Sequence, residues 1–145
     1  LMNNAYLLYD QFIKSNLLLA DGDRRFFSQY DLTPARFYAL KHIHERSGLS
    51  LSALSQLLLC TKGNATRILK GMEDQGHIRR CADPRDSRAY QLELTAEGQA
   101  LFTEVWQAYL LFNKDRFAHF DSENLENMLR EMRALNDNLQ KQLAE

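Results

Sequence analysis

Polar side chains gather in one short stretch, from Thr61 to Arg67, whose residue types suit hydrogen bonding to the edges of nucleic-acid bases. Asparagine can form two hydrogen bonds with adenine, and arginine can form two with guanine, when a helix presents them in the major groove of DNA. Either these side chains read bases or they form an ordinary solvated helix face. The candidate DNA-contacting residues of the stretch are Thr61, Lys62, Gly63, Asn64, Thr66 and Arg67.

A second cationic group follows in the sequence Asp-Pro-Arg-Asp-Ser-Arg, residues 83–88. Arg88 suits a narrow minor groove, because the negative potential of such a groove attracts a guanidinium group. Arg85 is expected to do the same or to contact phosphate. We expect Asp83 and Asp86 to be structural and to brace the loop against its arginines.

The charge of the chain is unevenly distributed. Residues 61–90 carry seven basic and four acidic side chains, a net charge of +3, whereas residues 91–145 carry five basic and ten acidic ones, a net charge of −5. The overall charge of −1 and the isoelectric point near 6.5 therefore conceal a basic segment. A protein that contacts phosphate with one face shows such a distribution.

The spacing of apolar residues predicts the elements that hold these side chains. Thr61 can cap a helix with its hydroxyl group, and Gly76 suits the left-handed position just beyond a helix end. Apolar residues recur between them at helical spacing. Beyond Gly76 the period changes to two, which predicts strands at 77–81 and 90–94 around the loop at 83–88. The stretch therefore indicates a helix followed by a β-hairpin wing.

Two shorter helices are predicted before this one. Thr33 and Pro34 form a strong helix start, because proline at the first position lacks an N–H that the helix does not use there. This helix should end at Ser47–Gly48. Ser50 then caps a short helix that ends near Cys60. Two short helices joined by a tight turn, the second with polar residues in its first turn, form the helix-turn-helix pattern.

Three longer helices are predicted outside this region, at residues 4–28 (weakened at 21–23), 96–119 and 122–143. Their apolar stripes exceed what a small central domain can cover, and a second copy of the chain is the simplest partner. We therefore expect a homodimer. The predicted interface residues are Leu8, Phe112, Leu125, Leu129, Met132 and Leu139.

Length and composition exclude several classes of protein. A chain of 145 residues with 45% hydrophobic residues is most simply one domain, residues 1–145. Its two cysteines predict a reducing, cytoplasmic compartment rather than a disulfide framework. No apolar run approaches the roughly 20 residues that span a membrane, and no secretory signal pattern opens the chain. No catalytic motif is present, and His42 and His44 point away from each other, so neither an enzyme, a cofactor nor a metal site is expected.

These features together resemble the MarR family of bacterial winged-helix transcriptional regulators. The matching segments are Leu54–Leu58, Thr61–Arg67, Met72–Arg80, the Asp83–Arg88 wing (the family's D-x-R-D-x-R) and Leu94–Gly98 (its L-T-x-x-G).

The resemblance implies a mainly α fold with a small β-hairpin wing. A winged helix-turn-helix region at 33–95 would be flanked by dimerisation helices at 1–30 and 96–145. It also implies a homodimer, expected to be a repressor, that binds double-stranded DNA at a palindromic operator. The alternative is a winged helix that contacts proteins without specific DNA readout, but such a wing would lack basic residues.

The resemblance further implies release from DNA by a small ligand or by an oxidant. A ligand pocket would be lined by aromatic side chains, although such stripes are usually core. The candidates are Tyr9, Phe12, Phe37, Tyr38, Trp106 and Tyr109. Cys60 precedes the helix that starts at Thr61, and a helix N-terminus favours the reactive thiolate. The alternative role for Cys60 is that of a small buried hydrophobe, and Cys81 in the wing is expected to be inert.

Overall fold

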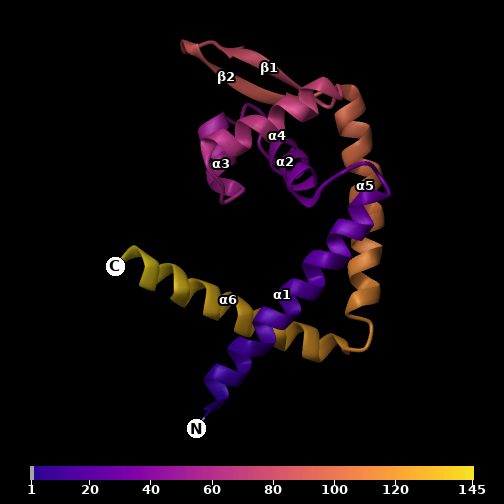
Figure 1. The fold of residues 1–145 in the computed structure, drawn as a ribbon, viewed down its shortest axis with the longest axis vertical. Coiled ribbons are helices and arrows are strands. Elements are labelled where there is room, and N and C mark those ends of the chain that lie inside the picture. Colours follow the sequence, from indigo (N-terminus) through magenta and orange to yellow (C-terminus); the bar gives the residue numbers. More distant parts are fainter. Residues whose placement is uncertain (1) are drawn as a thin grey trace. The chain divides into compact units, whose positions relative to one another are not determined.

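The computed structural model describes residues 2–145 and is mainly helical, with one two-stranded antiparallel hairpin (Figure 1). This confirms the predicted fold class. The chain forms two compact units, the first ending at Gln107 and the second covering Ala108–Glu145. The assignment of a DNA-binding region and of dimerisation helices stays a prediction. The elements are α1 (Asn4–Ser28), α2 (Pro34–Glu45), α3 (Leu51–Leu57), α4 (Lys62–Asp74), β1 (Ile78–Asp83), β2 (Asp86–Leu94), α5 (Ala96–Arg116) and α6 (Ser122–Ala144).

Side-chain caps begin the helices where the sequence predicts them. The hydroxyl oxygens of Thr33, Ser50 and Thr61 accept hydrogen bonds from the backbone N–H three residues later, at 3.2, 3.1 and 3.1 Å. The Asp121 carboxylate caps α6 in the same way, 2.8 Å from the Asn124 nitrogen. Each bond satisfies an N–H group that the first helical turn leaves without a partner.

The first helix does not weaken where the sequence suggested it would. α1 continues through residues 21–23, which include a glycine. Asp21 forms ion pairs with Arg24 at 3.0 Å and with Arg25 at 3.1 Å, and pairs at these spacings support a helix. Phe27, buried near the C-terminal end of α1, anchors it in the first unit.

The hairpin is longer than predicted. Asp83 pairs with Asp86 across the turn, so the connecting loop is two residues long rather than six. At the other end, the Leu92 N–H donates to the Leu49 carbonyl oxygen at 2.9 Å, which adds a short third extended segment. α5 also differs from the prediction, since it ends at Arg116 rather than near residue 119.

A stack of aromatic rings joins α1, α2 and α5 in the first unit. Phe37 on α2 has no exposed surface, and its ring lies 4.5 Å from that of Phe27 on α1. The Phe37 ring also stacks with those of Phe102 and Trp106 on α5, at centroid distances of 6.0 and 6.3 Å. Each aromatic pair of this kind contributes roughly 0.5–1.5 kcal/mol beyond the area it buries. The stack therefore fixes the helix on which the helix-turn-helix is built.

A junction between α4, β1 and α5 sets the direction of the hairpin. Gly76 has a φ of +78°, the left-handed conformation that ends α4. The Thr95 hydroxyl donates to the Gly76 carbonyl oxygen at 2.6 Å and accepts from the Gly98 N–H at 3.0 Å. Gly98 is buried there, and an added Cβ would lie 1.9 Å from the His77 carbonyl oxygen. The L-T-x-x-G motif therefore caps α5 and holds the end of α4 at once.

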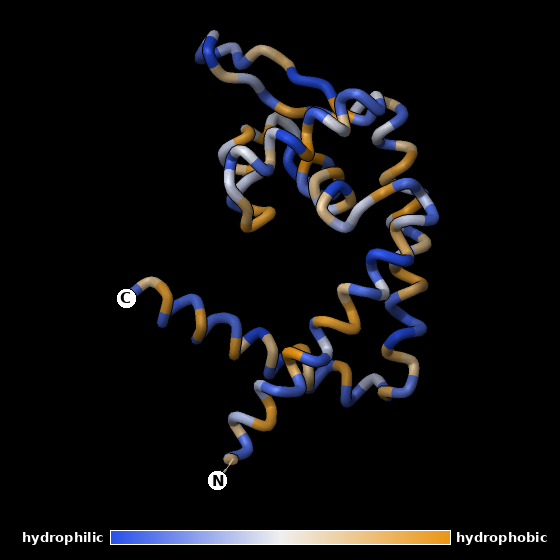
Figure 2. Tube along the Cα trace, in the orientation of Figure 1, coloured by the Kyte–Doolittle hydropathy of each residue, from blue (hydrophilic) through white to orange (hydrophobic). Residues whose placement is uncertain are grey.

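Apolar side chains on α1 and α6 remain exposed. Figure 2 shows apolar and polar turns alternating along both helices, and α6 has no buried residue. Among the predicted interface residues, Leu8, Leu129 and Leu139 are 57%, 52% and 44% exposed. Met132 is also exposed, whereas Phe112 and Leu125 are half-buried. No helix within residues 2–145 is both long enough and apolar enough to cross a bilayer.

Replacing Gly98 with alanine should destabilise the fold, because the new Cβ would overlap the His77 carbonyl oxygen. Overpacking of this kind costs about 1–3 kcal/mol, and urea unfolding measures the loss. Gly63→Ala is the matched control, since no atom lies within 4 Å of a Cβ added there. The control should gain about 0.5–1 kcal/mol from helix propensity. Equal stabilities of the two variants would contradict the role assigned to Gly98.

Candidate nucleic-acid interface

The burial of one side of α4 determines which of its side chains face outward. Ala65, Leu69 and Met72 have no exposed surface. The opposite side of the helix start therefore turns toward solvent. It carries the candidate DNA-contacting residues, of which Thr61, Lys62, Gly63, Thr66 and Arg67 are exposed and Asn64 is half-buried.

Asn64 and Arg67 form a hydrogen-bonded pair on this face. The Arg67 guanidinium donates to Asn64 Oδ1, one helical turn earlier. The groups that remain available to a partner are the Asn64 NH₂, the other guanidinium N–H groups and the second lone pair of Asn64 Oδ1, so the pair offers mainly donors. The Thr66 hydroxyl donates to the Lys62 carbonyl oxygen at 2.8 Å and can still accept a hydrogen bond.

Two aspartates build the tip of the hairpin. Asp83 Oδ1 accepts from the Arg85 N–H at 2.8 Å, and Asp86 Oδ1 accepts from the Arg88 N–H at 2.9 Å. The carboxylates thus brace the loop mainly through backbone groups. The Arg88 Nε atom lies 3.8 Å from Asp86 Oδ1, and the Arg88 side chain is 93% exposed.

A shift of register places Arg88 outside the regular part of the hairpin. Ala82 faces Tyr90 and Asp83 faces Asp86, so residues 87–89 of β2 have no counterpart on β1. Bulges bend a strand and redirect its side chains. Arg88 is the middle residue of this segment. The sequence pattern alone did not reveal the bulge.

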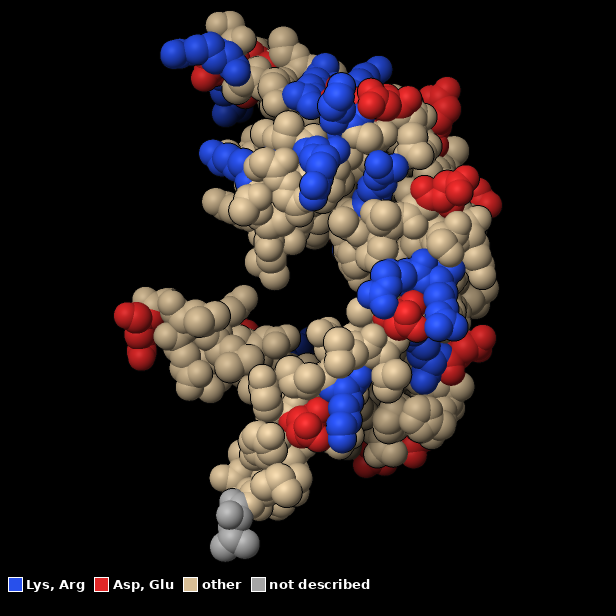
Figure 3. All heavy atoms as spheres, in the orientation of Figure 1, with Lys and Arg blue, Asp and Glu red and all other residues tan. Residues whose placement is uncertain are grey.

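The cations around α4 and the hairpin differ in whether an acidic side chain pairs with them. Arg79 pairs with Glu93 at 3.0 Å, and Arg80 pairs with Glu73. Figure 3 shows Lys and Arg atoms gathering over the hairpin and the helices beside it. An exposed cation without a carboxylate partner keeps its charge available for phosphate. Within residues 2–145, such cations include Lys62, Lys70 and Arg85.

The thiol of Cys81 lies beside this paired region. Its hydrogen bond to Glu93 raises the pKa of the Cys81 thiol, while the neighbouring Arg79 lowers the pKa of the Glu93 carboxyl. A thiol that stays protonated is a poor nucleophile. This agrees with the inert role expected for Cys81.

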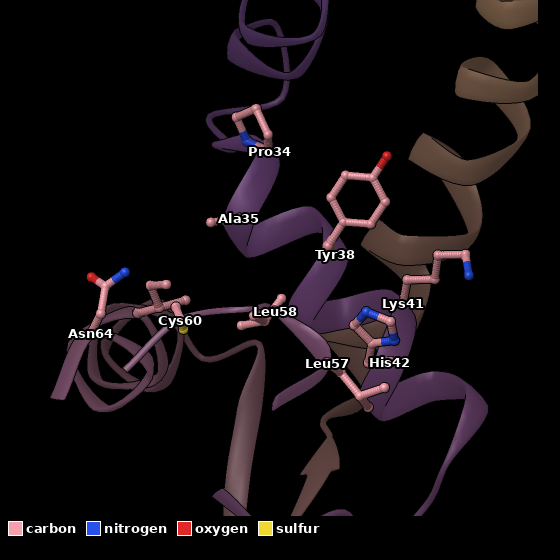
Figure 4. Close-up of a pocket in the computed structure, with 10 residues that line it drawn as sticks. Pro34, Ala35, Tyr38, Lys41, His42, Leu57, Leu58, Cys60 and Asn64 are labelled. Carbon is pink, nitrogen blue, oxygen red and sulfur yellow. The ribbon is translucent and has the colours of Figure 1, made fainter. Parts of the chain in front are cut away.

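A cavity of about 420 Å³ lies between α2, the end of α3 and the start of α4 (Figure 4). Tyr38, Lys41 and His42 line it from α2, and Cys60 at the α3–α4 turn and Asn64 on α4 also line it. Asn64 therefore belongs both to the outward face of α4 and to the wall of the cavity. A small molecule in this cavity would contact a candidate DNA-contacting side chain.

The six aromatic residues predicted to line a pocket do not come together at this cavity. Tyr38 lines it, whereas Phe37 lies in the core with Trp106 stacked on its ring. Tyr9 is 59% exposed on α1, Phe12 is half-buried there, and Tyr109 is buried in the second unit. Lys41 and His42 were missed as lining residues, although their positions three and four residues after Tyr38 place them on its helix face.

Two residues of the cavity lining, His42 and Lys41, interact with charged neighbours. Burial, helped by the nearby charge of Lys41, lowers the pKa of His42 and thereby favours its neutral imidazole. Lys41 pairs with Glu45 at 2.6 Å, and this hydrogen bond lowers the pKa of the Glu45 carboxyl. No group of three or more metal-ligating side chains comes together among residues 2–145.

Comparison with known proteins supports the winged-helix fold. Residues 30–89 match the model of the MarR family. The HTH-type transcriptional regulator PrsX of Escherichia coli is 27% identical over 123 residues, covering 83% of this chain and 74% of that protein. A mutant MarR from E. coli complexed with operator DNA has a TM-score of 0.80 at 19% identity, covering 91% of this chain and 96% of that one. Staphylococcus aureus MarR in complex with salicylate and kanamycin has a TM-score of 0.85 at 16% identity, covering 94% and 93%.

A helix-turn-helix followed by a two-stranded wing, with long helices before and after it, defines a winged-helix transcriptional regulator. Residues 30–89 match the MarR family, and the chain has the fold of solved MarR structures. It is a DNA-binding regulator of transcription and not an enzyme.

Proposed function

We propose that this chain is a homodimeric repressor that binds a palindromic DNA operator and is released by a small aromatic ligand or an oxidant. The observation that carries the proposal is the outward donor face of α4 beside an exposed basic wing tip. A winged helix that contacts proteins alone would have no need of cations at that tip. A repressor of this kind acts in the cytoplasm, where its operator lies.

The recognition helix, α4, is proposed to enter the major groove. Because Arg67 occupies Asn64 Oδ1, the pair presents donors. Donors match the O6 and N7 acceptors of guanine, whereas bidentate pairing of Asn64 with adenine would require the asparagine oxygen to accept a bond from the base. The bonded pair can therefore read guanine through its donors, and it can read adenine where Asn64 Oδ1 accepts a second hydrogen bond. Lys62 at the helix start would contact phosphate.

The wing is proposed to follow the adjacent minor groove. Arg88 lies in the bulged segment of β2, and its side chain is nearly fully exposed. A guanidinium in this position can enter a narrow groove, where the potential is most negative. Arg85, at the turn, would contact the phosphate backbone and supply affinity without sequence preference.

The homodimer is proposed from the apolar faces of α1 and α6. α6 buries none of its residues within a single chain, although leucine and methionine recur along it at helical spacing. Exposed apolar stripes of this length mark a protein interface. Two copies related by a two-fold axis would place two α4 helices on successive major grooves of a palindromic site.

Release is proposed to act through the cavity beside α4. Tyr38 offers a phenol hydroxyl that can donate to an aromatic carboxylate, and Lys41, whose ammonium group pairs with Glu45, would share its N–H donors between the two carboxylates. The complex of S. aureus MarR with salicylate supports salicylate as a first probe, since that protein has the same fold. Oxidation of Cys60, which also lines the cavity, is the alternative trigger.

Substitutions of Arg88 and Asn64 should weaken DNA binding in different ways. Arg88→Ala should weaken cognate and scrambled duplexes alike and reduce the salt dependence by roughly one counterion per wing. Asn64→Ala should cost about 1–3 kcal/mol per half-site on the cognate duplex and leave scrambled DNA nearly unchanged. The cognate duplex is selected from a random pool, and fluorescence anisotropy across a salt series measures both affinities. Equal weakening of both duplexes by Asn64→Ala would show that α4 does not read the bases.

Leu139→Arg should convert the protein to monomers, because a charge would enter the proposed apolar interface. Sedimentation equilibrium measures the mass, and operator affinity should fall with it. Ala134→Arg is the matched control, because this exposed residue lies on the polar side of α6. A Leu139→Arg variant that remains dimeric would place the interface elsewhere.

Salicylate should lower operator affinity if the cavity is the effector site. Tyr38→Phe should weaken that response by removing the hydroxyl group, whereas Tyr30→Phe, which lies outside the cavity lining, should leave it unchanged. Anisotropy titrations of the operator complex with salicylate measure the effect. If salicylate has no effect but peroxide abolishes binding, and Cys60→Ser prevents that loss, release is redox-driven.

A further inference from the structure

One side chain, Arg80 on β1, joins the wing to the recognition helix. Its Nε donates to the Glu73 carboxylate of α4, and its Nη1 donates to the Tyr90 hydroxyl of β2 at 2.8 Å. The central guanidinium carbon lies 4.7 Å from the centroid of the Tyr90 ring, a cation–π contact. The guanidinium therefore holds three elements, α4, β1 and β2, together.

The register of the hairpin explains why Arg80 turns inward and Arg79 does not. Arg80 faces Leu92 across the strands, and Leu92 has no exposed surface. Arg79 lies on the opposite face, where it pairs with Glu93 inside the hairpin. The Arg80 side chain is 29% exposed and that of Arg79 is 64% exposed. Solvent and salt therefore weaken the Arg80–Glu73 pair less than the Arg79–Glu93 pair.

Beyond Arg80 the hairpin has few contacts that could hold its tip in place. Ala82 and residues 84–88 are exposed. Among the ion pairs within residues 2–145, the Arg80–Glu73 pair is the one that connects the hairpin to α4. A small rotation at this point would move the distant tip by a larger distance. The Arg80–Glu73 pair therefore lies at a point from which it can determine the position of Arg88.

We propose that Arg80 is a positioning residue that fixes the wing on the recognition helix through Glu73, so that α4 and Arg88 contact DNA in a single geometry. The inference rests on the proposed DNA-binding function. Arg80 itself need not touch DNA. Arg80 holds the wing in place before DNA binds. Less conformational entropy is therefore lost when the complex forms.

Glu73→Gln separates this positioning role from a simple electrostatic effect, because the two predict opposite changes in DNA affinity. Removing a negative charge near a DNA-binding face should strengthen binding, whereas loosening the wing should weaken it. We expect about tenfold weaker binding of the selected duplex. Glu93→Gln, the matched control, removes the partner of Arg79 and should not weaken binding. Tighter binding by Glu73→Gln, or equal losses in both variants, would overturn the proposal.

A double-mutant cycle with Arg88→Ala tests whether the pair acts through the wing tip. Once Arg88 is gone, the position of the tip matters less, so Arg80→Ala should cost much less in the Arg88→Ala background than in the wild type. Arg79→Ala should cost the same in both backgrounds. Arg80→Lys, which keeps the ion pair, should recover most of the affinity, and urea unfolding confirms that each variant is folded. Full additivity of Arg80→Ala with Arg88→Ala would overturn the inference, whereas failure of the wild type to select any duplex would overturn the proposed function instead.

Discussion

The burial of Ala65, Leu69 and Met72 is the constraint on which the DNA-facing side of this protein depends. Three apolar side chains at helical spacing allow α4 one orientation about its axis. The Thr61 cap fixes where the helix begins, and burial then fixes which residues turn outward. The core beneath α4 is in turn held by the ring stack around Phe37, which joins α1, α2 and α5.

Hydrogen bonds and ion pairs within the chain restrict the available positive charge to fewer places than the number of basic residues suggests. Arg79 and Arg80 are neutralised by carboxylates, so the cations available for phosphate lie at the start of α4, along it and at the wing tip. The donors of α4 are likewise arranged before any DNA is bound, since Arg67 already holds Asn64. Preorganised groups lose less entropy on binding.

The same helix face connects DNA readout with the proposed release. Asn64 borders the cavity beside α2, so an occupant would act directly on a side chain that is proposed to read a base. Movement of whole subunits, which the family resemblance suggests, would be a second route. The two differ in their physical basis: the first changes one hydrogen-bonding group, whereas the second changes the spacing of two helices across the exposed apolar faces of the proposed dimer.

Local signals in the sequence determined most elements, because a cap such as Thr61 and a glycine such as Gly76 act within one turn of chain. They also determined the outward residues of α4, since helical periodicity identifies the buried side. Tertiary structure decided what depends on contacts between distant residues. The bulge at Arg88 follows from the register of two strands, the partner of Arg80 lies on another element, and the rings that stack on Phe37 come from α1 and α5. Periodicity shows that a side chain is buried, but the packing of the folded chain determines which residues it contacts.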